Sequence, residues 1–446
     1  YPGIAVDITS FTYSYSFEQN PNWSRVFAKG NELYEYANSC VDKYNIRENF
    51  RFDVDVEKAI YDEKNAVWTV YAKDGRMFTA SIIISATGAL TDPKYPDIKG
   101  INTFKGKIIH TAKWEKGYDL NNKNVAVIGT GASSVQLIPN IAPIVKQLYV
   151  YQRTPIWIFP KPDAVIPSGV QQLFNKLPFT QNSVRKITDK ITETVMLTGV
   201  VNYKQLPFIV QSLEAMCLSY LKSQVADEIL RKKLTPNYGF GCKRPSFSSD
   251  YYATFNRKNV ELITESIQEI TKNGIVTNDG KEREIDTLIT ATGFNVMKDS
   301  NYLNYQLFGK DGKELGKFWS ENRLQAYQGC SVPGFPNFFI IFGPYSASGL
   351  SWFDMIEIQL NHIMRVLNEQ KKRQKKSVEI KQEAHDNYFK FILEKQKNTV
   401  FYNNNCGNSN SYYFDKFGDA PFLRPLTVAK SKAYSLHSDL EHYSYE

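Results

Sequence analysis

A short apolar run that leads into a glycine turn constrains the fold of this chain more than any other feature. Val125 to Ile128 has the apolar character of a parallel strand that is buried on both faces. Gly129, Thr130 and Gly131 then turn the chain, and an apolar helix face follows from Ala132 to Ala142. The sequence therefore predicts a strand, a turn and a helix whose first backbone N–H groups can hold a pyrophosphate.

The residues after this turn indicate which dinucleotide it binds. A second strand, Leu148 to Gln152, is followed by Arg153 and Thr154, roughly twenty residues after the turn. An acidic residue there would bond a ribose 2'-hydroxyl, whereas an arginine suits a 2'-phosphate. We therefore predict NADP and not NAD, the alternative being an ordinary α/β unit with a surface arginine. The residues expected to contact NADP from this unit are Gly129, Thr130, Gly131, Ala132, Ser133, Ser134, Gln136, Arg153 and Thr154.

The third glycine position of the turn departs from the usual pattern. Ser134 stands where Gly or Ala is usual in dinucleotide-binding turns. A side chain at this position separates the helix from the strand. We therefore expect slightly looser helix–strand packing at Ser134.

Two later stretches repeat one order of strands and end on the same tripeptide. Strands are predicted for Phe52 to Ile60, Val67 to Ala72 and Ile82 to Ser85, and Ala-Thr-Gly closes this set at 86–88. The second set is predicted at 260–263, 267–270, 274–276 and 287–290, and Ala-Thr-Gly follows it at 291–293. Such a tripeptide lets the backbone pass close to a cofactor. The repetition predicts a duplicated dinucleotide-binding design.

Length and composition restrict the class of protein. A chain of 446 residues is too long for one ordinary core, and 42% hydrophobic and 22% charged residues are typical of a globular protein. No run approaches the ~20 apolar residues of a membrane helix, so we expect no stable membrane insertion. The net charge is +8, but its densest run, Lys371 to Lys376, has no interleaved aromatics. This run is typical of a solvated helix end and not of a nucleic-acid site.

The cysteines and the first residues of the chain indicate the cellular compartment in which the protein is expected. The five cysteines stand far apart without a CxxC pair, which favours a reducing, cytoplasmic compartment and argues against a structural metal. Nothing at the start reads as a signal peptide, and the chain begins at Tyr1 without a methionine. A first GxGxxG turn with its ribose acid is absent from these residues, so this chain is expected to bind FAD weakly.

The middle of the chain differs from both flanks. Between 161 and 238 the glycine-turn pattern is absent and apolar residues recur at helical intervals, for example Ile187 and Ile191, which predicts a helical insertion. The predicted fold is α/β, with two Rossmann-like domains that contain parallel sheets and β-meanders. The predicted domains are the first part of a FAD domain (1–114), the first part of an NADP domain (119–160), the insertion (161–238), and the second parts of the NADP domain (239–294) and the FAD domain (295–446).

A segment upstream of the glycine turn resembles a family fingerprint. Phe104, Gly106, His110 and Trp114 stand in the spacing FxGxxxHxxxW. This resembles Baeyer–Villiger monooxygenases, flavoproteins that use FAD and NADPH to insert oxygen beside a carbonyl. Flavin-containing monooxygenases, which oxidise heteroatoms, usually carry Tyr or Phe where this chain has Trp114. Glu115 departs from the pattern, and His110 could equally gate the site or only pack in a linker.

Residues towards both ends of the chain extend this resemblance. Tyr1 to Asp7 resembles the end of a second fingerprint, [FY]P[GM]xxxD. The resemblance implies that Asp7 and Tyr13 lie beside the flavin, that Asp7 orients a catalytic arginine, and that Val56 is a further FAD contact. By residue type alone, Asp7 could be a turn or cap residue. Ser411 to Asp415 resembles, more loosely, a C-terminal strand near the substrate.

Lys243 and Arg244 lie in the segment GFGCKRP. The resemblance implies that Lys243 contacts the NADP phosphate and that Arg244 stabilises the peroxyflavin. A compact ammonium suits a phosphate, and a planar guanidinium holds an anion in fixed geometry. Without the resemblance, adjacent Lys and Arg in a loop would be a solvated surface pair.

The resemblance implies an enzyme that binds FAD and NADP and converts a ketone into an ester or lactone through a C4a-peroxyflavin. Its expected partners are O2 and a small-molecule substrate, a ketone or another lipophilic compound, and no nucleic acid. One alternative is a monooxygenase that oxidises amines or sulfides. Another is an inactive fragment of such an enzyme.

Overall fold

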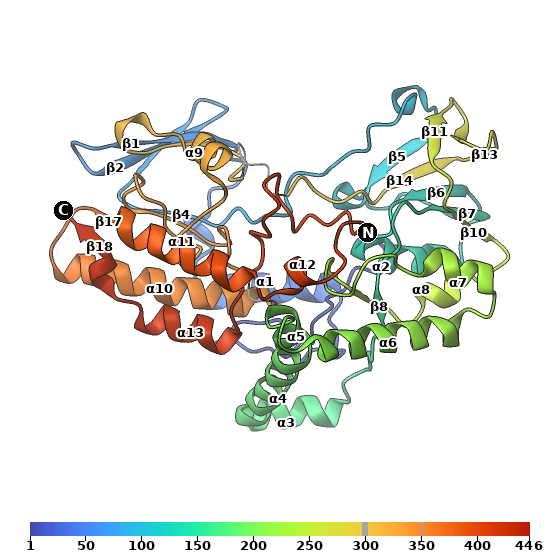
Figure 1. The fold of residues 1–446 in the computed structure, drawn as a ribbon, viewed down its shortest axis with the longest axis horizontal. Helices are drawn as coiled ribbons and strands as arrows, with labels where there is room; N and C mark the ends of the chain where they lie inside the picture. The colour runs from blue at the N-terminus through green and yellow to red at the C-terminus, as the bar shows by residue number, and fades with distance from the viewer. Residues whose placement is uncertain (297–301, 348, 350) are drawn as a thin grey trace.

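The computed structural model describes residues 1–296, 302–347, 349 and 351–446. Its elements form two lobes with a group of helices beneath them, and the chain passes between the lobes more than once (Figure 1). One lobe contains β5, β6, β7, β10 and β14, and the other contains β1, β2, β4 and the C-terminal helices. The fold is the predicted α/β class, in which helices and parallel strands alternate.

A five-stranded parallel sheet forms the centre of the first lobe. Its strand order is β10-β7-β6-β14-β5, and every neighbouring pair is parallel. The predicted strand before the glycine turn is β6, in the middle of the sheet, and the predicted helix is α2. The bounds are β5 Lys107–His110, β6 Asn124–Ile128, α2 Ala132–Ile141, β7 Gln147–Tyr151, α8 Tyr251–Thr254, β10 Val260–Ile263 and β14 Thr287–Thr290.

β5 connects this lobe to the segment with the first fingerprint. It pairs with β14 through Lys107 to His110, so these residues belong to the sheet of β6 although they precede position 114. The domain boundaries themselves stay predictions. Val125, Val127, Leu137 and Ile138 have almost no exposed surface in the core between the sheet and α2. The alternation of strand and helix therefore buries a continuous apolar layer.

Both predicted meanders are present. In the second lobe β1, β2 and β3 pair antiparallel and β15 adds a parallel edge, while β4 pairs with β16 in a separate two-stranded sheet. In the first lobe β11, β12 and β13 form an antiparallel sheet. The bounds are β1 Val56–Asp62, β2 Val67–Ala72, β3 Met77–Ala80, β4 Ile83–Ser85, β11 Ile267–Ile270, β12 Gly274–Thr277, β13 Glu282–Glu284, β15 Gln306–Phe308 and β16 Phe338–Ile340.

The two Ala-Thr-Gly tripeptides have equivalent places and backbone conformations. They follow β4 and β14, each a parallel strand, and their glycines Gly88 and Gly293 have φ angles of 72° and 82°. A residue with a Cβ atom rarely adopts this left-handed conformation. The glycine of each tripeptide is therefore required by the turn.

Helices cover the second lobe and continue into the C-terminal part. The last residues of α10 begin the exposed basic run at Lys371, which was predicted as a solvated helix end. The bounds are α1 Gly30–Lys43, α9 Leu315–Asn322, α10 Trp352–Lys372, β17 Val378–Ile380, α11 Gln382–Gln396, α12 Val400–Asn403, α13 Val428–His437 and β18 Tyr443–Tyr445. Short helical turns are η1 Arg47–Asn49, η2 Ile101–Thr103, η3 Thr111–Lys113, η6 Lys310–Gly312 and η7 Leu440–His442.

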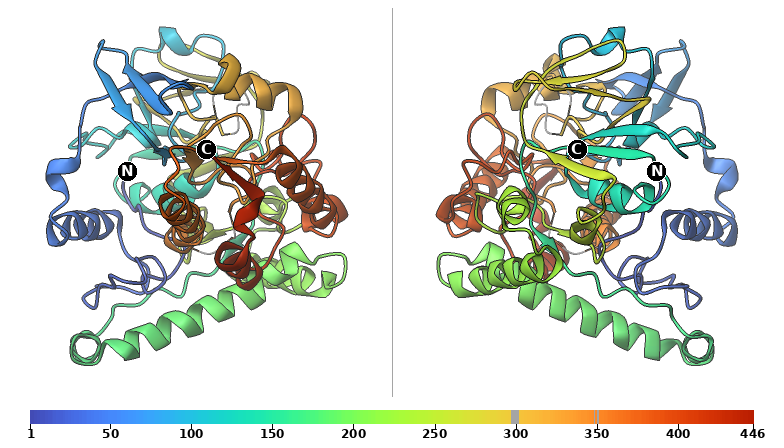
Figure 2. Two further views of the ribbon diagram at one scale, coloured as in Figure 1. Left: turned by 90° about the vertical axis from the view of Figure 1, so that its left-hand side faces the viewer. Right: turned by 90° about the vertical axis from the view of Figure 1, so that its right-hand side faces the viewer.

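The predicted helical insertion is present and lies along the lower side of the molecule (Figures 1 and 2). The short parallel pair β8 and β9 holds its entry and exit together. The bounds are β8 Ile158–Phe159, α3 Ser168–Lys176, α4 Pro178–Thr192, η4 Glu193–Leu197, α5 Thr198–Val201, α6 Pro207–Gln224, α7 Glu228–Leu234 and β9 Ser246–Phe247. Among the described residues, no helix has the length and apolar character needed to cross a membrane.

The structure corrects the expectation drawn from the cysteine spacing. Cys242 and Cys406 are 164 positions apart, yet their Cα atoms lie 5.1 Å apart and they form a disulfide. Cys40, Cys217 and Cys330 are free and buried. The spacing of the cysteines along the chain did not indicate this disulfide, because the C-terminal segment folds back onto the loop before Lys243. The described residues contain no group of His, Cys, Asp or Glu arranged for a metal ion.

Candidate active site

The glycine turn forms an open cradle at the N-terminus of α2. Gly129 has a φ of +107°, and a Cβ there would lie 2.5 Å from the carbonyl oxygen of Ala291. Gly131 is the N-cap and contributes no side-chain cap, while a Cβ built on it meets nothing within 4 Å. The turn therefore leaves open space beside Gly131 at the N-terminus of α2, which fits the predicted pyrophosphate.

The sides of the cradle are held by hydrogen bonds that come from distant segments. Thr130 Oγ1 donates to the backbone oxygen of Thr154 at 2.8 Å. Asn410 Nδ2, from the C-terminal segment, donates to Thr154 Oγ1 at 2.8 Å. Ser134 is fully buried, and its hydroxyl has no hydrogen-bond partner within the described part of the chain. A buried hydroxyl without a hydrogen-bond partner destabilises the folded state, so the serine at this position lowers the free energy of unfolding.

Two cations stand at the place predicted for the 2'-phosphate. Arg153 is exposed, two residues after the end of β7, and Lys243 is partly buried. Burial, reinforced by the charge of Arg153, lowers the pKa of Lys243 to about 8. Because each cation disfavours the charge of the other, a phosphate dianion between them would relieve this repulsion. The pair therefore fits NADP.

Asp7 is tied to α2 by a glutamine. Gln136 Nε2 donates to Asp7 Oδ1 at 3.2 Å and to the backbone oxygen of Ala5 at 2.8 Å. The Tyr1 hydroxyl donates to Gln136 Oε1 at 3.0 Å. Gln136 was predicted as a nucleotide contact, but in the structure its side chain binds the N-terminal segment. It fixes the position of Asp7 relative to the nucleotide cradle.

Arg244 faces Asp7. Its Nη2 atom lies 3.8 Å from Asp7 Oδ2, and its side chain is 39% exposed while that of Asp7 is 7% exposed. Burial opposes the charge of the guanidinium, but Tyr412 and Asp7 raise the pKa of Arg244. The guanidinium is therefore charged at every physiological pH and is free to meet an anion.

The other predicted residues divide into those near this pair and those away from it. Tyr13 packs edge-on against Phe353 with ring centroids 5.3 Å apart, and burial, with the charges of Arg244 and Asp7, shifts its pKa upward overall. Val56 starts β1 and pairs with Ala72, and no described contact joins it to Asp7. The remaining cradle residues, Ala132 and Ser133, lie in the first turn of α2.

His110 ends β5 at the joint between the lobes. It is 3% exposed, its Nδ1 accepts a hydrogen bond from Ala112 N at 3.1 Å, and burial lowers its pKa. Its ring lies 5.1 Å from that of Tyr95 and 6.3 Å from that of Phe294. The imidazole is therefore neutral and packed among aromatics.

Two groups of residues near Arg244 were missed or misread in the sequence. Lys161 Nζ lies 3.7 Å from Asp7 Oδ1, although nothing in the local sequence marks Lys161 as part of a site. Ser411 to Asp415, expected as a strand, forms turns. Tyr412 and Tyr413 from these turns influence the charge of Arg244. Both contacts arise between segments far apart in sequence.

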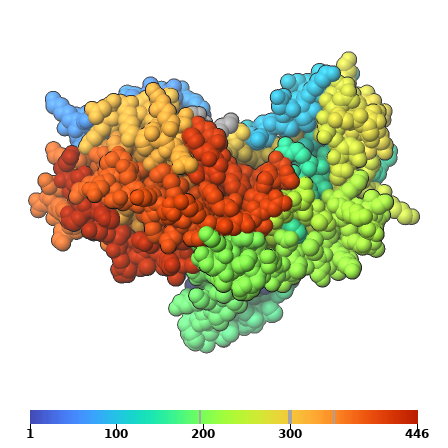
Figure 3. Space-filling model, in the orientation of Figure 1, coloured from blue at the N-terminus to red at the C-terminus, as the bar shows by residue number. Residues whose placement is uncertain are grey.

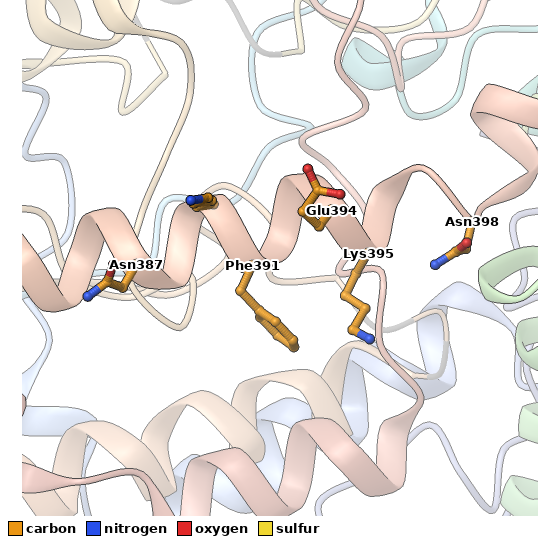
Figure 4. A pocket seen from close by; sticks show the side chains of 6 residues that line it. Asn387, Phe391, Glu394, Lys395 and Asn398 are labelled. Carbon is orange, nitrogen blue, oxygen red and sulfur yellow. The ribbon is translucent and has the colours of Figure 1, made fainter.

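The surface is hollowed between the lobes on the upper side (Figure 3). A separate hollow of about 510 Å³ runs along α11 (Figure 4). Its lining residues are Asn387, Lys390, Phe391, Glu394, Lys395 and Asn398. None of these belongs to the Asp7–Arg244 group or to the nucleotide cradle. The active-site assignment therefore rests on the cradle and the Asp7–Arg244 group.

Comparisons with known proteins identify the family of this chain. The pyridine nucleotide-disulphide oxidoreductase family matches residues 7–201. A Baeyer-Villiger monooxygenase of Pseudomonas aeruginosa is 36% identical over 414 residues, 93% of this chain and 77% of the relative. Another, from Streptomyces coelicolor, is 34% identical over 447 residues, 99% of this chain and 84% of the relative.

A solved structure agrees with these sequence relatives. The complex of OTEMO with FAD and NADP matches 100% of this chain and 91% of its own, with a TM-score of 0.86 and 27% identity. The nucleotide cradle, the cation pair and the Asp7–Arg244 group thus occur in a fold shared with a protein that holds both cofactors. With identities above 30% across more than nine tenths of its length, the chain belongs to the Baeyer–Villiger monooxygenase family, whose members are flavin-dependent oxidoreductases.

Proposed function

We propose that this protein uses NADPH, FAD and O2 to insert one oxygen atom beside the carbonyl of a lipophilic ketone, giving an ester or lactone. The observation that carries the proposal is the placement of Arg244 against Asp7, next to aromatic side chains, with Asp7 held to α2 by Gln136. A charged, partly exposed guanidinium in such surroundings can stabilise negative charge that develops on oxygen.

The first task of the chain is to hold NADP. The N–H groups at the start of α2 would bind the pyrophosphate, and Arg153 with Lys243 would bind the 2'-phosphate. Gly129 lets the turn approach Ala291 closely, so the Ala-Thr-Gly segment after β14 borders the same space. These contacts would place the nucleotide along the edge where the parallel strands end.

The second task is to orient the groups that face FAD. When bound, FAD supplies the redox chemistry that activates dioxygen. Asp7 and Tyr13 would border it, and Gln136 holds Asp7 in register with α2. Arg244 would provide a fixed positive charge at the reacting oxygen, which lowers the free energy of the charged transition state.

Aromatic side chains indicate the substrate class. Phe353 packs on Tyr13, and Phe422 packs on Tyr412 with ring centroids 5.7 Å apart. Tyr13 and Tyr412 both lie close enough to Arg244 to influence its pKa, so these rings border the same region. An apolar border with one cation favours a lipophilic compound with a single carbonyl group.

The test uses the purified protein supplied with FAD and NADPH. A panel of cyclic, linear and aryl ketones is assayed for esters or lactones, alongside amines and sulfides, with NADPH consumption and peroxide release recorded. Ketone oxygenation that is tightly matched to NADPH consumption supports the proposal. Oxygenation of the heteroatom compounds alone would contradict it and would identify the heteroatom-oxidising alternative.

We also propose a cytoplasmic location, where NADPH is supplied. The supply of NADPH supports this location, whereas the Cys242–Cys406 disulfide is a bond that reducing compartments disfavour. Fractionation of the source cells with an antibody against the protein tests this. Recovery in a secreted or membrane fraction would refute the cytoplasmic location.

A further inference from the structure

A mostly buried lysine without a role in the proposed function approaches Asp7 at the carboxylate oxygen that Arg244 leaves free. The side chain of Lys161 is 12% exposed, and its Nζ lies 3.7 Å from Asp7 Oδ1. Arg244 Nη2 lies 3.8 Å from the other oxygen, Oδ2. One carboxylate therefore stands between two cations.

The position of Lys161 is fixed at both ends of the residue. Its Nζ donates to the backbone oxygen of Val6 at 2.6 Å and lies 4.9 Å from the ring centroid of Phe27. Its backbone N–H donates to Ser249 Oγ at 3.2 Å, and Ser249 Oγ donates to the backbone oxygen of Lys161 at 2.8 Å. The ammonium thus stays beside Asp7 and cannot swing into solvent without breaking the contact to Val6.

The three charges do not cancel. Lys161 and Arg244 carry two positive charges and Asp7 carries one negative charge, so the group has a surplus of one positive charge. Without Lys161, Asp7 would neutralise Arg244, and an anion next to the guanidinium would meet a neutral pair. In a partly desolvated site one unit charge changes such an interaction considerably.

We propose that Lys161 is a positioning residue that neutralises Asp7 and so leaves the charge of Arg244 available for the negative charge that develops during oxygen transfer. This inference rests on the proposed function. The proposed function makes Arg244 the source of the positive charge, and the inference explains how Lys161 prevents Asp7 from neutralising that charge. Burial lowers the pKa of Lys161, whereas the carboxylates of Asp7 and Asp163 raise it, so the lysine depends in part on the carboxylate that it neutralises.

The first experiment compares Lys161→Met, Lys161→Arg and wild type. In Lys161→Met, we expect the yield of ester per NADPH to fall by about 5- to 30-fold. The electrons would then appear as peroxide, since NADPH, O2 and a proton yield NADP⁺ and H2O2. Lys161→Arg keeps the charge and should retain most of the yield. FAD content and melting temperature should stay at wild-type values.

A control removes a less buried lysine that also pairs with a carboxylate, in a different part of the molecule. Lys310 is 27% exposed at the side chain and pairs with Glu379 at 2.8 Å in the second lobe. Lys310→Met should leave the yield per NADPH at the wild-type value. An equal loss in Lys310→Met and Lys161→Met would show a general effect on folding and would overturn the proposal.

The second experiment asks whether Lys161 acts through Asp7. In an Asp7→Asn background there is no carboxylate to neutralise, so Lys161→Met should have almost no further effect on the yield. A lysine that only supports the local fold would cause the same fractional loss in both backgrounds. That additive result would refute the assignment.

A readout without substrate or turnover covers the case in which Asp7→Asn is inactive. Arg244 is 39% exposed, so its modification by phenylglyoxal can be followed by mass spectrometry of its peptide. Lys161→Met should slow this modification severalfold, because Asp7 then pairs with Arg244 alone, and should not slow it in Asp7→Asn. An unchanged rate in Lys161→Met overturns the inference. If the wild type makes no ester while the labelling behaves as expected, the proposed function fails but the charge arrangement stands.

Discussion

At the scale of single residues, the site depends on a charge pair that is close but not closely bonded. Arg244 and Asp7 approach to 3.8 Å, which is longer than a hydrogen bond. A guanidinium held more tightly would have less charge to offer a second anion. The spacing therefore suits an arginine that must act on a reacting group and not only on its own partner.

The first prediction concerns Arg244. We expect Arg244→Ala to keep oxidising NADPH while the oxygenated product falls by about 100- to 1000-fold, because a preorganised donor to the developing charge is lost. Lysine should not restore the product, since an ammonium lacks the planar fork of the guanidinium. Product, NADPH and peroxide are measured together, and a mutant that still converts ketones at wild-type yield would show that Arg244 is not catalytic.

The second prediction concerns Lys243 and pH. Because the pKa of Lys243 is about 8, its side chain is positively charged below pH 8 and loses this charge as the pH rises through that value. We therefore expect the preference for NADPH over NADH to decrease between pH 7 and pH 9. Dissociation constants for both nucleotides at each pH provide the measurement. Lys243→Arg, which stays charged, should show no such decrease, and an equal pH dependence in that variant would exclude Lys243 as the titrating group.

At the scale of elements, β6, the turn and α2 act with β7 as one nucleotide-binding unit. The parallel register of β6 and β7 brings the end of β7, and with it Arg153, beside the start of α2. The loop with Lys243 comes from beyond the helical insertion and, in the proposed function, would complete the phosphate site. The selectivity for NADP would then be divided between two segments that are about ninety positions apart in the printed sequence.

The third prediction tests this division. Arg153→Glu or Lys243→Glu should weaken NADPH far more than NADH, because each loses a charge-assisted contact worth roughly 1.5 to 3 kcal/mol and adds repulsion of the 2'-phosphate. Lys146→Glu, an exposed change before β7, is the control and should affect both nucleotides little. Equal losses for NADPH and NADH in the first two variants would show that another site recognises the phosphate.

At the scale of the whole molecule, the C-terminal segment joins the two lobes through several contacts near the site. Asn410 bonds Thr154, Tyr412 lies near Arg244, and Cys406 is bonded to Cys242, directly before Lys243. The loop that carries Lys243 and Arg244 is therefore attached covalently to the C-terminal segment. This attachment fixes the position of the nucleotide cradle relative to the aromatic side chains near Arg244.

The fourth prediction is that reduction of this disulfide destabilises the protein. A link between residues 164 positions apart stabilises by up to about 5 kcal/mol in the chain-entropy description. Denaturant unfolding with and without dithiothreitol should show a lower midpoint after reduction, together with more peroxide released per NADPH. Cys406→Ser should behave like the reduced protein and should not respond to dithiothreitol. An identical midpoint before and after reduction, verified by thiol counting, would contradict the prediction.

Much of the fold could be predicted from the sequence because the signals were local. The strands at 67–72, 260–263, 267–270 and 287–290 were predicted with the bounds observed, since apolar runs between turn residues specify a strand within a few positions. The glycine turn and both Ala-Thr-Gly tripeptides could also be recognised from local sequence, because Gly129, Gly88 and Gly293 have positive φ angles that favour glycine.

The parts that only the folded chain reveals are contacts between distant segments. Lys161 reaches Asp7, Tyr412 reaches Arg244 and Cys406 meets Cys242, and no spacing or periodicity in the sequence records these approaches. Gln136 likewise binds the N-terminal segment, a contact that its place on the nucleotide helix did not indicate. Local sequence specifies strands, turns and the nucleotide cradle through backbone sterics and apolar periodicity. The charge balance around Arg244 depends on long-range packing, which places side chains by the free energy of the whole core and not by their neighbours along the chain.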